Sequence, residues 1–98
     1  MIERIVRMSF REEKVKEFLT LFNKTKDQIA SFKGCHGLKL LRDVRHHHVL
    51  FTYSSWESEE ALEQYRKSEL FRSTWQQTKE MFESKASAWS VYVEDIVK

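Results

Sequence analysis

The chain is organised around residues 53–82, which begin YSSWESEEALEQYRKSELFRSTW. An aromatic strand end at Tyr53 leads here directly into two helices. Two of the three tryptophans, Trp56 and Trp75, lie within this stretch. Because it joins strand to helix and is rich in aromatic side chains, we expect the sheet and the helices of the domain to meet here.

Two serines mark the predicted starts of these helices. Ser58 is placed as an N-cap, since a serine hydroxyl accepts a hydrogen bond from the free N–H groups of a first helical turn, and a second helix is expected to start at Ser68. The first helix is expected to carry Ala61, Leu62 and Tyr65 on one side. The second carries an apolar stripe at helical spacing, formed by Phe71, Trp75, Thr78 and Phe82. We expect this stripe to face the sheet.

Two extended segments precede this stretch, residues 38–43 and 48–54. The short polar link between them, residues 44–47, favours an antiparallel hairpin. Residues 49–53 are apolar at odd-numbered and even-numbered positions alike. In a strand with one face in water, apolar and polar residues would alternate. The second strand of the hairpin is therefore expected to be covered on both faces.

The first segment, residues 2–10, has the period-two pattern of a half-buried strand, and Arg4 is the one charge on its even-numbered face. From Glu12 the spacing becomes helical and predicts a long amphipathic helix that ends near residues 32–33. Gly34 follows directly, where a left-handed C-cap is expected.

A last strand is predicted over residues 88–97, again with apolar residues on both faces. The order strand, helix, strand, strand, helix, strand is that of an α+β, ferredoxin-like split βαβ domain with a four-stranded antiparallel sheet. Helices cover one face of such a sheet, and its other face is apolar in at least the last two strands. We therefore expect a single domain, residues 1–98, that pairs through its sheet faces as a homodimer.

The composition excludes several classes of protein. The 98 residues are 41% hydrophobic and 13% aromatic, enough for one core, and the single cysteine excludes an intrachain disulfide. The 17 Lys and Arg against 15 Asp and Glu give a net charge of +2, without the basic footprint of a nucleic-acid binder. No apolar run approaches the roughly 20 residues that span a bilayer. We expect a cytoplasmic protein that binds neither nucleic acid nor a membrane.

RNA-recognition domains share this topology and place stacking aromatic side chains on the third strand, where this chain has Phe51 and Tyr53. The basic, glycine-containing signature of that strand is absent from residues 48–53. Packing in the core is the simpler interpretation of these aromatic residues, so RNA binding is not expected.

Three consecutive histidines, His46, His47 and His48, invite a metal interpretation because imidazole suits zinc, copper or nickel. No cysteine or acidic residue lies at a recognisable ligand spacing, so a solvated hairpin tip is favoured and no metal is expected. His36, beside Cys35, is either a titrating group at a pocket edge or a plain loop histidine. Their adjacency in sequence does not give these two side chains the geometry of a nucleophile and its base.

Trp56 lies between a strand and a helix start, where a split βαβ fold leaves a gap between sheet and helices. An indole at this junction either lines a cavity or fills it, and both interpretations stand. Tyr65 and Trp75, one on each following helix, are expected to face the same gap.

A family resemblance is carried by Gly34-Cys35, the segment FTYSSWESEEAL (51–62), Tyr65, Ser68-Glu69-Leu70-Phe71 and Trp75. In this pattern the chain resembles the antibiotic biosynthesis monooxygenase (ABM) domain family. The resemblance implies a dimeric α/β barrel, two ferredoxin-like subunits with their sheets facing inward, and a pocket between sheet and helices. Members of the family oxidise aromatic polyketides or quinols with molecular oxygen and without flavin or metal, the substrate anion supplying the electron.

A haem-degrading branch of this family uses an asparagine on the first strand, a tryptophan at the end of the third strand, and a histidine on the last helix as iron ligand. The tryptophan matches Trp56, whereas the asparagine position falls on Val6 and the histidine position on Trp75. An indole does not coordinate iron, so haem degradation is disfavoured and no cofactor is expected.

The leading expectation is a cofactor-independent monooxygenase that oxidises a small aromatic substrate of the quinol or polyketide type with molecular oxygen. The substrate-binding residues expected are Tyr53, Trp56, Tyr65, Phe71 and Trp75. The alternative is a non-catalytic dimeric module for ligand binding or stress response with the same barrel, its cavity filled by its own aromatic side chains.

The catalytic candidates are Trp56, His36 and Arg4. Deprotonation of the substrate is the chemical requirement, and the base is open among His36, His48 and Tyr53. Arg4 either stabilises the resulting anion or pairs with a carboxylate.

Overall fold

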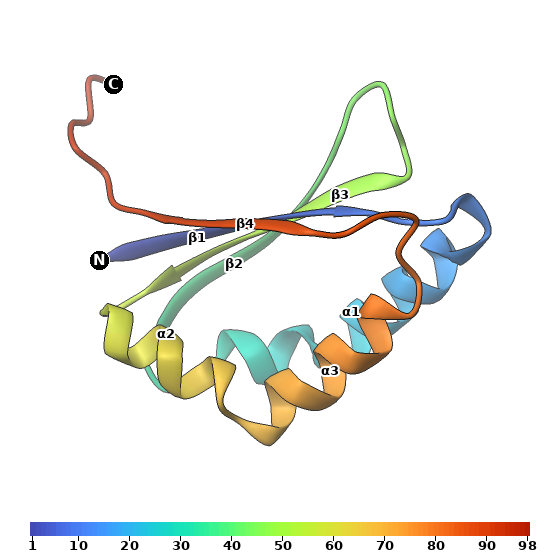
Figure 1. Ribbon diagram of the computed structural model, residues 1–98. Coiled ribbons are helices and arrows are strands. Elements are labelled where there is room, and N and C mark those ends of the chain that lie inside the picture. The colour runs from blue at the N-terminus through green and yellow to red at the C-terminus, as the bar shows by residue number, and fades with distance from the viewer.

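The fold is one antiparallel sheet with every helix on one of its faces (Figure 1). The computed structural model describes all residues, 1–98. Its strands are β1 (Ile2–Ser9), β2 (Cys35–Arg42), β3 (Val49–Trp56) and β4 (Ser87–Val91). Its helices are the short 3-10 helix η1 (Glu12–Lys14), then α1 (Val15–Ala30), α2 (Glu59–Arg66) and α3 (Glu69–Lys79). This order and the β2-β3-β1-β4 sheet confirm the predicted ferredoxin-like α+β fold.

The strand register determines which side chains reach the helices. Strand β1 lies between β3 and β4, and Arg4 pairs with Ser54 on one side and with Ser90 on the other. Because side chains alternate along a strand, the even-numbered residues face the helices in all four strands, beyond a bulge at the start of β2. The odd-numbered residues face the side that no helix covers (Figure 1).

The predicted cap at Ser58 is present, and Ser68, the predicted start of the second helix, is a cap as well. The Ser58 hydroxyl accepts a hydrogen bond from the Ala61 N–H at 3.1 Å, and the Ser68 hydroxyl accepts one from the Phe71 N–H at 3.1 Å. Each serine has an extended backbone, so each begins a new helix. The break at Ser68 divides the second helical region into α2 and α3, which lie on the same side of the sheet (Figure 1).

Helix α1 ends at Ala30, before the predicted end near residues 32–33. The Ser31 hydroxyl donates to the Asp27 carbonyl at 2.8 Å, and the Ser31 backbone has already left the helical conformation. A serine that satisfies a last-turn carbonyl in this way ends the helix early. Gly34 has a φ of 90°, the left-handed conformation expected of it, and turns the chain into β2.

Strand β4 is shorter than predicted, since it ends at Val91 and not at the end of residues 88–97. Its last pairing joins Val91 to Glu3, near the start of β1, so β1 offers no further partner. The tail after β4 leaves the sheet (Figure 1), and its apolar residues Tyr92 and Ile96 are exposed.

The core lies between the sheet and the helices. Its central cluster consists of Met8, Phe10, Val15, Phe18, Leu50 and Met81. Phe82 does not lie on the helical stripe as predicted, because α3 ends at Lys79. Phe82 instead forms an isolated backbone bridge with Phe10, and their ring centroids are 5.4 Å apart. None of the helices has the length and apolarity needed to cross a membrane.

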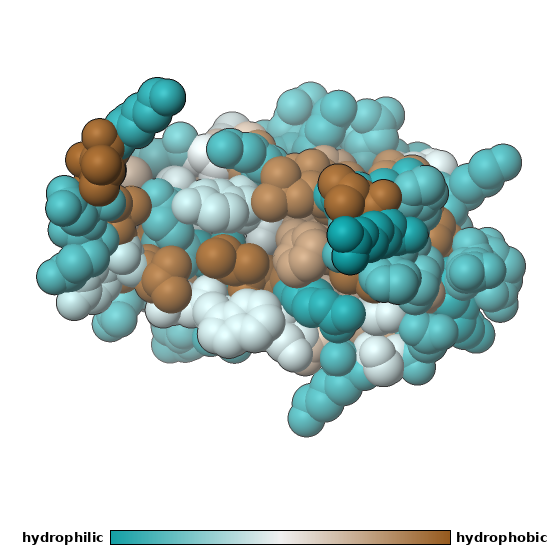
Figure 2. Space-filling view, turned by 90° about the horizontal axis from the view of Figure 1, so that it is seen from above, coloured by the Kyte–Doolittle hydropathy of each residue, from teal (hydrophilic) through white to brown (hydrophobic).

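The uncovered face of the sheet is apolar in β3 and β4, as predicted, and mixed in β1 and β2. Its odd-numbered strand residues include Ile5, Leu41, Phe51, Tyr53, Trp89 and Val91. Trp89 is 48% exposed, a large apolar area on a single chain. Figure 2 looks onto this face and shows apolar side chains, in brown, lying among hydrophilic ones, in teal. No helix of the chain covers this face (Figure 1).

Candidate functional site

A cavity of about 290 Å³ lies between the helix-facing side of the sheet and the helices. Its volume is near the lower end for small-molecule sites in proteins. The sheet and α1 contribute Arg4, Val6, Phe18, Leu21, Phe22, Thr25, Ile29, Leu38, Thr52, Ser54, Trp56, Ala86 and Ala88 to its lining. Helices α2 and α3 contribute Leu62, Tyr65, Arg66, Phe71, Thr74, Trp75 and Thr78. Thirteen of these 20 residues are hydrophobic, so the cavity suits an apolar ligand.

A continuous aromatic wall runs along this cavity from β3 to α3. Trp56 stacks on Tyr65 with ring centroids 4.8 Å apart and planes at 24°. Tyr65 meets the edge of Phe71 at 5.2 Å, and Phe71 stacks on Trp75 at 5.8 Å with planes at 12°. Such a wall offers both ring faces and ring edges to a flat ligand.

Trp56 both fills the core and lines the cavity, so the two interpretations left open by the sequence are both correct. It is 0% exposed, and its indole Nε1–H donates to the Ser54 hydroxyl at 2.9 Å. This hydrogen bond fixes the indole against β3, because a buried N–H without an acceptor would destabilise the fold. The part of the indole that borders the cavity is therefore held rigidly.

Tyr65 contributes a phenol to this wall. Burial raises the pKa of the Tyr65 hydroxyl well above its ordinary value, and the electrostatic effect of Cys35 acts in the same direction. At neutral pH its O–H is therefore a hydrogen-bond donor and does not act as a base.

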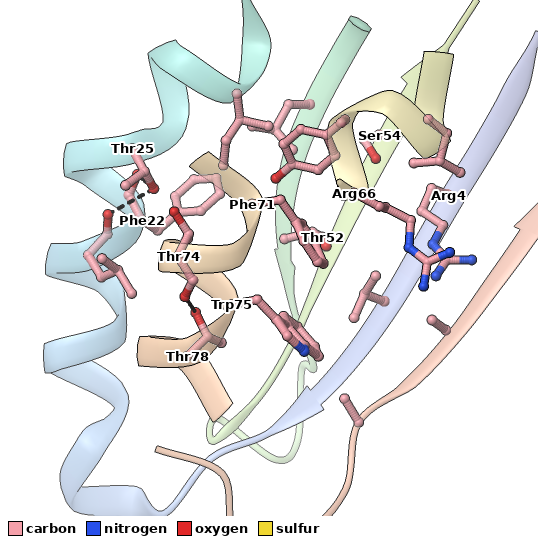
Figure 3. Close-up of a pocket in the computed structure, with 18 of the residues that line it drawn as sticks. Arg4, Phe22, Thr25, Thr52, Ser54, Arg66, Phe71, Thr74, Trp75 and Thr78 are labelled. Carbon is pink, nitrogen blue, oxygen red and sulfur yellow. Dashed lines mark hydrogen bonds between the residues drawn. The ribbon is translucent and has the colours of Figure 1, made fainter. Parts of the chain in front are cut away.

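Two arginines occupy one end of the cavity. Arg4 comes from β1 and Arg66 from the last turn of α2, and Figure 3 shows both guanidinium groups directed to the same end of the site. Burial lowers the pKa of Arg4, the positive charge of Arg66 lowers it further, and Glu63 opposes the shift. Arg66 bonds Glu63 at 3.4 Å, whereas Arg4 donates to the neutral Ser90 hydroxyl at 2.9 Å. Arg4 therefore has no carboxylate partner, which removes one of its two predicted roles.

The other polar side chains of the lining carry no charge. Two of them form hydrogen bonds with backbone carbonyls of their own helices (Figure 3). The Thr25 hydroxyl donates to the Leu21 carbonyl at 3.0 Å, and the Thr78 hydroxyl donates to the Thr74 carbonyl at 2.7 Å. No aspartate, glutamate, histidine, lysine or cysteine lines the cavity. The arginines are thus the only charged groups of the lining.

The three predicted base candidates lie outside this site. Tyr53 is odd-numbered and points to the uncovered face of the sheet, where the Lys39 ammonium lies 5.4 Å from its ring centre. His36 is exposed at the bulge that opens β2. His48 lies at the hairpin end, with its Nε2 atom 3.5 Å from a Glu83 carboxylate oxygen. Tyr53 and His36 therefore do not line this cavity, whereas Trp56, Tyr65, Phe71, Trp75 and Arg4 all line it.

Arg66 and Ser54 were missed at the sequence level, although a signal existed for each. Arg66 follows Leu62 by four residues, so the two share a helix face. Ser54 lies two residues before Trp56 on β3, so the two side chains lie on the same side of the sheet.

The donor groups of the cavity do not fit haem. Val6, Trp56 and Trp75, the three positions compared with the haem-degrading branch, all line the cavity. No histidine or cysteine joins them, and an indole at position 75 offers iron no ligand. The hairpin histidines are no better placed, since no three His, Cys, Asp or Glu residues of the chain gather closely enough to hold a metal ion.

Known structures share this architecture. A conserved protein from Methanosarcina mazei Go1 superimposes with a TM-score of 0.88 at 19% identity, over 92% of this chain and 89% of its own. A structure described as an antibiotic biosynthesis monooxygenase gives 0.90 at 14% identity, over 97% of this chain and 100% of its own. Rv0793 from Mycobacterium tuberculosis gives 0.89 at 16% identity, over 99% and 98%. At these identities the likeness establishes the fold alone.

Comparison of the sequence with known proteins identifies the family of this chain. No curated protein matches this chain. Residues 1–77 match the family model described as antibiotic biosynthesis monooxygenase, and this segment includes β1 through α2 and most of α3, hence most of the cavity lining. The chain therefore belongs to the antibiotic biosynthesis monooxygenase family.

Proposed function

We propose that the protein is a cofactor-independent monooxygenase that oxidises a small aromatic substrate of the quinol or polyketide type with molecular oxygen. The observation that carries this proposal is the aromatic cavity itself, in which Trp56, Tyr65, Phe71 and Trp75 form a continuous wall beside about 290 Å³ of space. The family supports the reaction type, and the shape and apolar lining support a flat aromatic substrate.

The proposed reaction needs an electron-rich substrate. Molecular oxygen accepts electrons one at a time, and a phenolate or enolate gives up an electron far more readily than the neutral phenol. In the balanced reaction a phenol with a hydrogen on the ring carbon ortho or para to its hydroxyl reacts with O₂ to give a quinone and water. One oxygen atom replaces that hydrogen as a carbonyl, and the other leaves as water with the two hydrogens of the substrate.

The chain's own residues have distinct parts in this scheme. Trp56, Tyr65 and Trp75 hold the ring and exclude water, which strengthens every charge interaction inside the cavity. Arg4 stabilises the substrate anion, because a partly buried guanidinium without a carboxylate partner attracts a negative oxygen. His36, His48 and Tyr53 have no part, since they lie outside the cavity.

We also propose that the protein acts as a homodimer paired through the uncovered sheet faces. Ile5, Phe51 and Trp89 lie on that face, and an antiparallel sheet that is apolar on both sides requires a cover on both. The cavity lies on the opposite side of the sheet, between sheet and helices. Pairing would therefore close the barrel and leave each cavity complete within its own subunit.

A second function, ligand binding without oxidation, is favoured by one observation: no side chain of the lining is a general base at neutral pH. In one form of this alternative the protein's own aromatic side chains fill the cavity. The structure does not fit that form, because an open cavity lies beside Trp75.

Oxygen uptake separates the two functions. The wild type, a Trp75→Leu variant and a Tyr53→Phe control are incubated with a panel of hydroquinones, naphthols and anthrones in an oxygen electrode. The monooxygenase proposal expects uptake with at least one compound, loss of that rate in Trp75→Leu, and an unchanged rate in Tyr53→Phe. Binding of the same compounds, seen by tryptophan fluorescence, without any uptake would favour the second function.

A further inference from the structure

We propose that Arg4 and Arg66 form an oxyanion site at one end of the cavity, so that the pocket takes its phenolic ligand as the phenolate and no protein base is required. This inference rests on the proposed function and names how its substrate becomes ionised. It concerns the charged end of the cavity, which the aromatic wall does not explain.

The first support is the placement of two like charges at one end of an apolar site. Arg4 extends from the middle of β1, Arg66 extends from the end of α2, and both line the cavity (Figure 3). Their charges are close enough for Arg66 to lower the pKa of Arg4. Two guanidinium groups that repel each other are stabilised when an anion lies between them.

The second support is the shortage of negative charge around this pair. Glu63 contacts Arg66 at 3.4 Å, in a pair whose two side chains are 45% and 50% exposed. Its effect on the pKa of Arg4 is smaller than the effects of burial and of Arg66. No charged group other than Arg66 and Glu63 shifts the pKa of Arg4. This end of the cavity is therefore positive, and its surplus charge is that of Arg4.

The third support is the pair of neutral serine hydroxyls that flank Arg4 on the sheet. Ser90, directly opposite on β4, accepts from Arg4 Nη1 at 2.9 Å and so fixes the guanidinium. Ser54, directly opposite on β3, accepts from Trp56 Nε1 at 2.9 Å, and its own O–H has no acceptor in the structure. Arg4 and Ser54 are thus neighbours on the helix-facing side of the sheet, and both line the cavity.

The chemical consequence is that the substrate ionises without a protein base. A phenol has a pKa of about 10, and an opposite charge within a few ångströms lowers such a value by about 1 to 3 units. On binding, the phenolic O–H bond breaks, the proton passes to bulk water, and the electron pair stays on the oxygen facing the two arginines. The absence of histidine, aspartate and glutamate from the lining follows naturally from this arrangement.

The probe for this site is 2-naphthol, whose neutral and ionised forms differ in absorbance. We expect the wild type to bind it with an apparent pKa about 1 to 3 units below its value in free solution. Arg4→Gln and Arg66→Gln should each weaken naphtholate binding about tenfold or more, which corresponds to one such unit. Both variants should bind 2-methoxynaphthalene, which cannot ionise, as tightly as the wild type does. Arg7→Gln on the uncovered face and Arg72→Gln on α3 are the matched controls.

Three results would overturn the inference. The first is a bound 2-naphthol that titrates as it does in free solution. The second is an equal loss of 2-methoxynaphthalene binding in the arginine variants, which would show a structural role. The third is arginine-dependent binding of 2-naphthoate with no shift of 2-naphthol, which would assign the pair to carboxylates. A lowered naphthol pKa without oxygen uptake would support the oxyanion site and contradict the monooxygenase, so the two proposals fail separately.

Discussion

Trp56 at the end of β3 stacks on Tyr65 of α2, with 4.8 Å between ring centroids and 24° between planes. This contact ties α2 to the sheet, and it also forms the start of the cavity wall. The same two side chains therefore contribute to stability and to the site. Variants at these two positions must therefore be measured both for stability and for ligand binding.

Replacement of Trp56 should show how much stability the contact contributes. Trp56→Ala removes a fully buried indole and should lower the free energy of unfolding by about 3 to 5 kcal/mol. Tyr92→Ala, at an exposed aromatic in the tail, should change it by less than about 0.5 kcal/mol. Urea denaturation measures both, and equal effects would contradict the placement of Trp56 in the core.

The turn into β2 offers a matched pair of glycines. Gly34 has a φ of 90°, and a Cβ there would lie 2.5 Å from the Ala61 Cβ, whereas a Cβ at Gly37 would lie 3.9 Å from the Ser55 side chain. Gly34→Ala should therefore destabilise the fold by more than about 1 kcal/mol, and Gly37→Ala by clearly less. Thermal unfolding of the two variants tests this difference. A Gly34→Ala protein as stable as the wild type would show that the turn adopts another conformation.

Tyr65 should make stability fall in alkaline solution. Its folded-state pKa is raised, so the unfolded chain loses this proton first as the pH rises above about 10, and ionisation favours unfolding. The stabilisation is complete below that pH and is lost as the pH climbs toward the folded-state pKa. Denaturation midpoints from pH 8 to pH 11 should decline less steeply for Tyr65→Phe than for the wild type. Tyr92→Phe should follow the wild type, and identical slopes for all three would refute the assignment.

The uncovered sheet face should hold two copies together. Light scattering should give twice the mass of one chain, and Trp89→Glu should shift the protein toward monomer because it buries a charge in the interface. Lys85→Glu, outside the strands, serves as the control for added negative charge. A monomer mass at every concentration would defeat the dimer proposal.

Alternation and helical spacing were enough to predict the fold. The even-numbered pattern of β1 correctly predicts that Val6 and Met8 face the helices, and Ser58 and Ser68 correctly mark two helix starts. The length of β4 was not predictable in this way, because it depends on where β1 ends in the sheet. Such pairing is a contact between distant segments, and local patterns do not contain it.

The residues of the site were predicted in part, and the errors in that prediction have physical causes. Tyr53 is odd-numbered and Trp56 is even-numbered, and side chains alternate between the two faces along a strand. The two residues therefore lie on opposite faces of β3. Aromatic character alone led to their being grouped together. The space beside Trp75 depends on how several large side chains pack, which no spacing rule specifies. The convergence of Arg4 with Arg66 joins a strand to a helix and likewise requires the folded chain.

The central claim is that this cavity carries out oxygen insertion with the chain's own residues. The most direct measurement is turnover under ¹⁸O₂, in the presence of a metal chelator, with the substrate that gives oxygen uptake and mass analysis of the product. The account predicts one ¹⁸O atom in each product molecule and a rate lost in Trp75→Leu. Product that takes its oxygen from water, or oxidation that stops when the chelator is added, would contradict it.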